Sequence, residues 1–99
     1  MKKIIIINGP NLNVLGNREK SVYGKSTLED IEKICIKKSK ELNLECFFCQ
    51  SNNEGELINF IHTTQSDYDG LIINPAAFTH TSVALLDALR AIDKPKIEI

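Results

Sequence analysis

The chain has 99 residues, about one small domain, and its 42% hydrophobic and 25% charged residues are typical of a globular protein rather than a disordered one. Twelve basic and thirteen acidic side chains leave a formal net charge of −1, so the basic footprint of a nucleic-acid-binding protein is missing. No apolar run exceeds four residues and the N-terminus lacks the features of a signal peptide, so we expect one cytoplasmic domain over residues 1–99, with no nucleic-acid or membrane partner.

The first half of the sequence predicts a strand, a loop, a helix and a second strand. Residues 3–8 (KIIIIN) form a β-branched run that ends at Gly9 and Pro10, which suits a strand buried on both faces. Residues 12–25 have no clear periodicity, and loops of that length are usually either functional lids or disordered. Ser26 and Glu29 have the spacing of a capping box. The helix that follows carries these residues at helical spacing: Leu28, Ile31, Ile34, Cys35 and Leu42. Residues 45–50 (ECFFCQ) predict the second strand.

The second half repeats the same alternation. Residues 54–64 predict a helix with three inward-facing side chains: Leu57, Ile58 and Ile61. Residues 70–74 (GLIIN) predict a third buried strand, and residues 96–99 begin a fourth. Between them, residues 81–92 predict a helix with four apolar residues: Leu85, Leu86, Leu89 and Ile92. This alternation indicates an α/β fold, a doubly wound parallel sheet with helices on both faces and the flavodoxin-like strand order 2-1-3-4.

The strand order also predicts where a ligand binds. In an open parallel sheet the ligand lies beyond the carboxyl ends of the strands, where the strand order reverses, which here is between the first and third strands. Both strands end in an asparagine close to a proline, with Asn8 before Pro10 and Asn74 before Pro75. We therefore expect these two turns to face each other across one crevice. The third helix would point its amide groups at the same place, with His80 at its start, which suits an anionic group.

Arg18 and Tyr23 in the predicted lid suggest a chemistry for this crevice. A free tyrosine has a pKa of about 10, so little of it is ionised at neutral pH. A guanidinium group within a few ångströms favours the phenolate, and such a pair could act as a general base. Arg and Tyr also occur together in many loops without reacting, so the residues alone leave this open.

Three motifs carry a resemblance to a known family. They are residues 7–13 (INGPNLN) with the lid that follows, residues 50–58 (QSNNEGELI) and residues 74–85 (NPAAFTHTSVAL). In this order and over most of the chain, they resemble the signatures of type II 3-dehydroquinases (3-dehydroquinate dehydratases). The resemblance implies a flavodoxin-like fold, no metal or other cofactor, and homododecamers built from trimers. It also implies a lyase of the shikimate pathway, which serves aromatic amino acid biosynthesis. The expected reaction removes water from 3-dehydroquinate through an enolate to give 3-dehydroshikimate.

The resemblance also implies catalytic roles for three residues. Tyr23 matches the base that abstracts the C2 proton, and Arg18 matches the cation that keeps this phenol ionised and stabilises the transition state. Asn11 matches a residue that stabilises the enolate.

Further positions match the family's binding residues. Asn74 and His80 match substrate-binding positions. Asp87 matches another, which in this family can act across a subunit contact. Glu98 corresponds to the acidic residue that supports the proton donor.

The sequence departs from the family pattern after Ile99. The family's acid histidine, a serine and a substrate-binding arginine would follow there, together with the fifth strand and last helix. We therefore expect a domain that is incomplete at its C-terminus, and a 99-residue chain whose activity is lost or severely impaired.

The same residues bear on other functions of flavodoxin-like domains. A flavin site needs a hydroxyl- and glycine-rich loop after the first strand, where this chain has Pro10 and Leu12. A phosphorylated receiver needs carboxylates where this chain has Asn8 and Asn74. Cys46 and Cys49 have CxxC spacing, but positions three apart on a strand face opposite sides, which argues against a redox or zinc site. A non-catalytic assembly subunit or fragment remains the alternative.

Overall fold

A computed structural model describes residues 1–14, 27–80 and 82–99, without the side chains of residues 79 and 80. Its strands are β1 (Lys2–Asn8), β2 (Leu44–Gln50), β3 (Gly70–Asn74) and β4 (Lys96–Glu98). Its α-helices are α2 (Leu28–Glu41), α3 (Glu54–Asp67) and α4 (Val83–Arg90), and short 3-10 helices occur at η1 (Leu12–Val14) and η2 (Ala76–His80). The predicted helices and strands are therefore present within a few residues of their expected bounds, whereas the two 3-10 helices were not predicted.

The four strands form one parallel sheet in the order β2-β1-β3-β4, which confirms the predicted topology. β1 is central, because its β-branched run pairs with β2 on one side and β3 on the other. The register aligns Asn8 with Gln50 and with Asn74, so the last residues of three adjacent strands lie side by side. Three residues with amide side chains are therefore neighbours at the carboxyl edge of the sheet.

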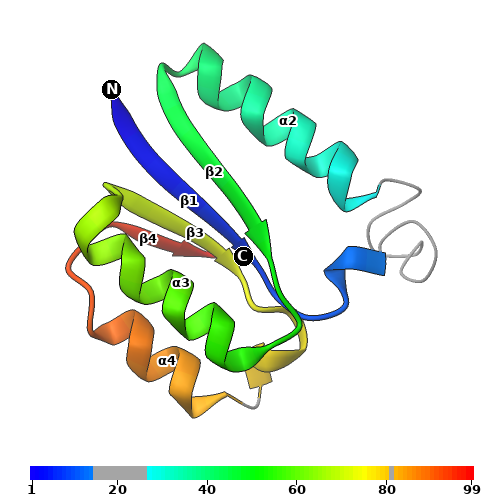
Figure 1. The fold of residues 1–99 in the computed structure, drawn as a ribbon, viewed down its shortest axis with the longest axis vertical. Helices are drawn as coiled ribbons and strands as arrows, with labels where there is room; N and C mark the ends of the chain where they lie inside the picture. The colour runs from blue at the N-terminus through cyan, green and yellow to red at the C-terminus, as the bar shows by residue number, and fades with distance from the viewer. Residues whose placement is uncertain (15–26, 81) are drawn as a thin grey trace.

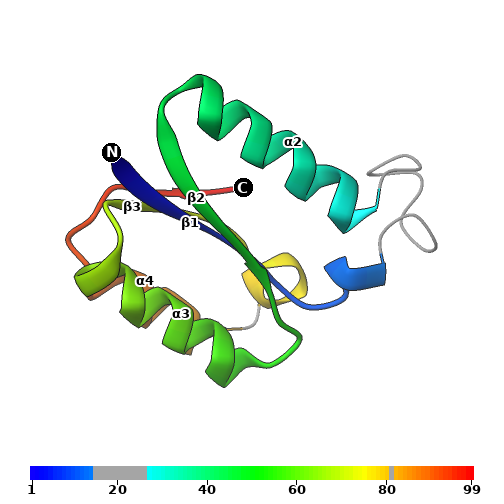
Figure 2. The same cartoon turned by 45° about the horizontal axis from the view of Figure 1, so that its top comes forward.

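The helices cover the two faces of the sheet unequally. Figure 2 shows α2 on one side of the sheet and α3 with α4 on the other, and Figure 1 shows α3 and α4 side by side. The main core lies between the sheet and the α3–α4 layer, where Ile5, Leu57, Ile61 and Ile73 are at most 1% exposed. The predicted inward positions of Leu57, Ile58 and Ile61 are confirmed. In the part of the chain that the structure describes, no helix combines the length and the apolar character that a bilayer crossing requires.

The start of α2 corrects the predicted cap. Thr27, not Ser26, is the N-cap residue, and its side chain accepts a hydrogen bond from the Asp30 backbone N–H at 3.1 Å. The Asp30 carboxylate accepts one from the Thr27 backbone N–H at 3.0 Å, which completes the box. Both residue pairs have the required three-residue spacing, and the structure uses the second because α2 begins at Leu28.

Three apolar helix residues face outward against expectation. Ile34 is 65% exposed, Leu42 is 58% exposed and Leu86 is 47% exposed. Their neighbours Ile31 and Leu85 turn inward, because a helix on a flat sheet buries only a narrow stripe of its surface.

Candidate active site

The turns that follow β1 and β3 are in direct contact, as the sequence predicts. The Gly9 backbone N–H donates a hydrogen bond to the Asn74 carbonyl oxygen at 2.7 Å. A Cβ atom at Gly9 would lie 2.5 Å from the Pro75 carbonyl oxygen, so only glycine fits without a shift of the backbone. The contact fixes the two turns relative to each other at the place where the strand order reverses.

Asn11 begins the chain's path away from this contact. Its φ of 67° lies in the left-handed region, which asparagine adopts more easily than most residues. Its carbonyl oxygen accepts a hydrogen bond from the Val14 N–H at 3.2 Å, which closes η1, and Leu12 is buried beside it. The predicted catalytic residue Asn11 is thus an exposed residue at the carboxyl edge of the sheet.

Asn74 and Pro75 form the opposing turn. The Asn74 side-chain oxygen accepts a hydrogen bond from the Ala76 backbone N–H at 3.2 Å, and Ala76 has a φ of 52°. A left-handed alanine stores backbone strain, of the kind that is common at functional sites. η2 continues from this turn to His80, and Ser82 then caps α4 by accepting a hydrogen bond from the Leu85 N–H at 3.0 Å. The backbone of His80 therefore lies between the Asn74 turn and the start of α4.

A third loop, between β2 and α3, belongs to the same cluster and was not assigned a role from the sequence. Gln50 donates from Nε2 to the Gly9 carbonyl oxygen at 3.1 Å and to the Asn52 side-chain oxygen at 3.0 Å. The same Asn52 oxygen accepts the Asn11 backbone N–H at 2.9 Å. The signal that could have found this loop is its amide-rich run, residues 50–53, at the end of a strand next to β1.

The other predicted site residues lie outside this cluster of loops or outside the described residues. Glu98 lies in β4 beside Ile73, one position from the Asn74 turn, and it is exposed. Asp87 is exposed in the middle of α4, beyond the first helical turn. Arg18 and Tyr23, with most of the predicted lid, lie outside the described residues.

The cysteines do not form a shared site. Cys49 packs against the core under α3, and Cys46 lines a hollow beside α2 with Ser39. Burial raises the pKa of the Cys49 thiol to about 12, so it is protonated at neutral pH. Among the described residues, no three His, Cys, Asp or Glu side chains are grouped so that they could hold a metal ion.

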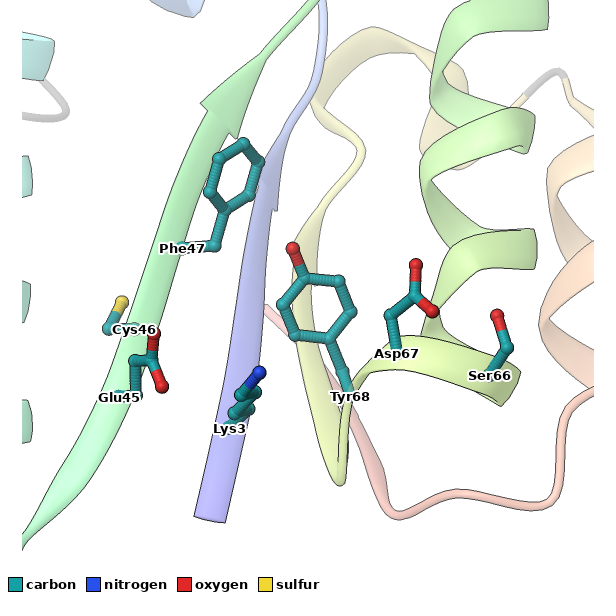
Figure 3. Close-up of a pocket in the computed structure, with 7 residues that line it drawn as sticks. All are labelled: Lys3, Glu45, Cys46, Phe47, Ser66, Asp67 and Tyr68. Carbon is teal, nitrogen blue, oxygen red and sulfur yellow. The ribbon is translucent and has the colours of Figure 1, made fainter. Parts of the chain in front are cut away.

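Two cavities differ in their relation to these turns. One of about 530 Å³ lies at the amino ends of the strands, away from the Asn8 and Asn74 turns, and Figure 3 shows Phe47 and Tyr68 among the residues that line it. A smaller apolar cavity of about 240 Å³ between α2 and the sheet reaches both Asn8 and Asn74. The carboxyl edge, with its three touching loops and its adjoining cavity, is the candidate active site by position and by residue type.

Comparisons with known proteins show the family to which the sequence is similar. The family model for class II dehydroquinases matches residues 2–99. A 3-dehydroquinate dehydratase from Dinoroseobacter shibae is 54% identical over 96 residues, which are 97% of this chain and 64% of the relative. Another from Caldicellulosiruptor saccharolyticus is 52% identical over 100 residues, which cover 100% of this chain and 69% of the relative.

A solved structure of a type II dehydroquinase has the same fold over the matched residues. The crystal structure of a type II dehydroquinase from Butyrivibrio crossotus superposes with a TM-score of 0.93 at 43% identity. The match covers 98% of this chain and 68% of that one. The chain thus spans about two thirds of the length of these matched proteins.

Proposed function

We propose, because the chain belongs to the class II dehydroquinase family, that the protein is a type II 3-dehydroquinate dehydratase of the shikimate pathway. The observation that carries this proposal is the Gly9–Asn74 contact, which brings the Asn11 and Asn74 turns to one edge of the sheet. Residues 1–99 form one flavodoxin-like domain, which would supply the groups that remove the proton, Tyr23 and Arg18. The alternative, a non-catalytic assembly subunit, is not favoured, since the matched relatives bear the name of the enzyme.

The proposed reaction begins with proton removal. The Tyr23 phenolate, kept ionised by Arg18, takes the C2 proton of 3-dehydroquinate, and the electron pair moves to the C3 carbonyl oxygen to form an enolate. Asn11 stabilises this oxyanion, while Asn74 and His80 bind the substrate. The enolate then collapses, the C1–O bond breaks, and the hydroxyl group leaves as water after accepting a proton from an acid that Glu98 supports. No step calls for a metal or an organic cofactor.

The proposal extends to location and assembly. We propose a cytoplasmic homo-oligomer, a dodecamer built from trimers, in which Asp87 approaches a neighbouring subunit's site. The exposed side of α4 supports this, because Val83 is 79% exposed and Leu86 is 47% exposed. Val83 precedes Leu86 by three positions and Asp87 by four, so it shares a helix face with each of them.

The catalytic proposal is tested by removing one phenolic oxygen. Tyr23→Phe should lower kcat by roughly 10²- to 10⁴-fold, the usual contribution of a general base. Tyr68→Phe is the matched control, because Tyr68 is the chain's other tyrosine and lies at the amino ends of the strands, away from the Asn11 and Asn74 turns. Turnover is followed by the enone absorbance of the product, for residues 1–99 and for the complete gene product. An inactive complete gene product, or a fully active Tyr23→Phe variant, would contradict the proposal.

A further inference from the structure

Two side-chain amides bind the backbone of the turn that carries Asn11. The turn runs through Gly9, Pro10 and Asn11, and Pro10 has no backbone N–H group. The backbone polar groups on either side of Pro10 are the Gly9 carbonyl oxygen and the Asn11 N–H. Gln50 Nε2 donates to the first at 3.1 Å, and Asn52 Oδ1 accepts from the second at 2.9 Å.

The two amides are also bonded to each other, which fixes their orientations. Gln50 Nε2 donates to Asn52 Oδ1 at 3.0 Å. A carbonyl oxygen only accepts and a backbone N–H only donates, so neither amide can be flipped without losing a bond to the turn. The result is a closed chain of hydrogen bonds from the Gly9 carbonyl through both amides to the Asn11 N–H.

This chain of bonds holds a backbone conformation that costs free energy on its own. Asn11 has a φ of 67°, a left-handed conformation that costs asparagine less than most residues but that still needs contacts to hold it. Asn11 is exposed, so burial does not provide that restraint. Its described N-terminal restraint is the hydrogen bond to Asn52, and its C-terminal restraint is the Val14 bond that closes η1.

We propose that Asn52, supported by Gln50, is a positioning residue that fixes Asn11 for catalysis. The inference rests on the proposed function, because Asn11 is taken to stabilise the enolate. An interaction made mainly in the transition state raises kcat without tightening substrate binding. A loosened Asn11 turn therefore lowers kcat and leaves KM nearly unchanged.

The test compares three substitutions in the complete gene product. Asn52→Ala removes the acceptor, Asn52→Asp keeps an acceptor of the same shape, and Asn59→Ala is the matched control on the exposed side of α3. We expect Asn52→Ala to lower kcat roughly tenfold, about the effect of one hydrogen bond, with KM within twofold. Asn52→Asp should restore most of kcat, and Asn59→Ala should match the wild type. Because Asp adds a negative charge near an anionic substrate, its rescue is judged on kcat rather than KM.

A second measurement reads the turn directly and without substrate. The backbone amide of Asn11 is followed by its ¹H–¹⁵N chemical shift and its hydrogen-exchange rate. We expect faster exchange and a shifted resonance in Asn52→Ala, and wild-type behaviour in Asn52→Asp. An unchanged Asn11 amide in Asn52→Ala, an unchanged kcat, or a failure of Asn52→Asp to recover would each overturn the inference. Absence of wild-type turnover would instead refute the proposed function, while the amide measurement would still decide whether the bonds to Asn52 hold the turn.

Discussion

Gly9 is the residue at which the two halves of the candidate site approach most closely. Its missing side chain lets the β1 turn lie against the Pro75 carbonyl, and its N–H bonds the Asn74 carbonyl. The same approach restrains the separation of Asn11 and Asn74, because Asn74 is part of the contact and Asn11 lies two residues after Gly9. The absence of a Cβ atom at Gly9 therefore allows the two turns to approach this closely.

Gly9→Ala should lower both stability and turnover. The added methyl would overlap the Pro75 carbonyl carbon at 2.7 Å as well as its oxygen, so the turns must separate. We expect the free energy of unfolding to fall by about 1–3 kcal/mol, the usual cost of overpacking. Urea denaturation measures the loss, and the enone assay measures turnover.

Gly55→Ala in α3 is the control for Gly9→Ala. An added Cβ there meets only the Asn53 side-chain oxygen, at 3.2 Å, and alanine favours a helix by up to about 1 kcal/mol. Equal destabilisation by the two substitutions would show that the Gly9 contact has no special role.

Among the elements, α2 begins with a cap whose strength depends on pH. The hydrogen bond from the Thr27 backbone N–H lowers the pKa of the Asp30 carboxyl below its ordinary value. A group with a lowered folded pKa stabilises the fold above its unfolded pKa, and that contribution is lost as the pH falls through the folded pKa. The cap is therefore complete at neutral pH and weakens in acid below about pH 4.

Two substitutions separate the parts of this cap. Thr27→Ala should lower the free energy of unfolding by about 1 kcal/mol at neutral pH, the usual cost of losing an N-cap side chain. Asp30→Asn keeps a side-chain oxygen but no charge, so its stability deficit relative to the wild type should shrink between pH 6 and pH 2. Urea denaturation at several pH values measures both effects. A deficit that stays constant over this range would contradict the assignment of the cap to Asp30.

Local sequence patterns predicted the elements well because strands and helices follow from local periodicity. The isoleucine run of β1 predicted a central strand, and the strand order followed from the alternation of elements. The cap of α2 was misplaced by one residue because two overlapping pairs satisfy the same spacing. Ile34 was expected inside because spacing alone does not show how wide a stripe the sheet covers.

The candidate site was predicted only in part. The meeting of the Asn8 and Asn74 turns follows from strand order, and the structure confirms it. The roles of Gln50 and Asn52 were missed, because their bonds join loops 41 positions apart through side chains, which periodicity does not describe. The Arg18–Tyr23 pair remains a prediction, since both residues lie outside the described part of the chain.

At the scale of the whole molecule, the faces that remain exposed bear on assembly. Val83 is the first residue of α4, where an acidic side chain is favourable because the helix dipole is positive at that end. Val83→Glu should therefore leave the fold intact while placing a charge in the proposed subunit contact. We expect this substitution to lower the assembled mass of the complete gene product in sedimentation velocity.

Ile34→Glu provides the comparison for Val83→Glu. Ile34 is 65% exposed on α2, the helix on the other face of the sheet, so the same change in charge there should leave the mass unaltered. A wild-type monomer, or a Val83→Glu variant with the wild-type mass, would contradict the proposed assembly through α4.

The central place of β1 also has a consequence during synthesis. A ribosome releases this strand before either of its partners, since β2 and β3 both come later in the chain. Until they emerge, four consecutive isoleucines have no sheet to join, and such segments invite aggregation or chaperone binding. We expect residues 4–7 of the nascent polypeptide to need a bound chaperone to prevent aggregation until Gly70–Asn74 has left the exit tunnel.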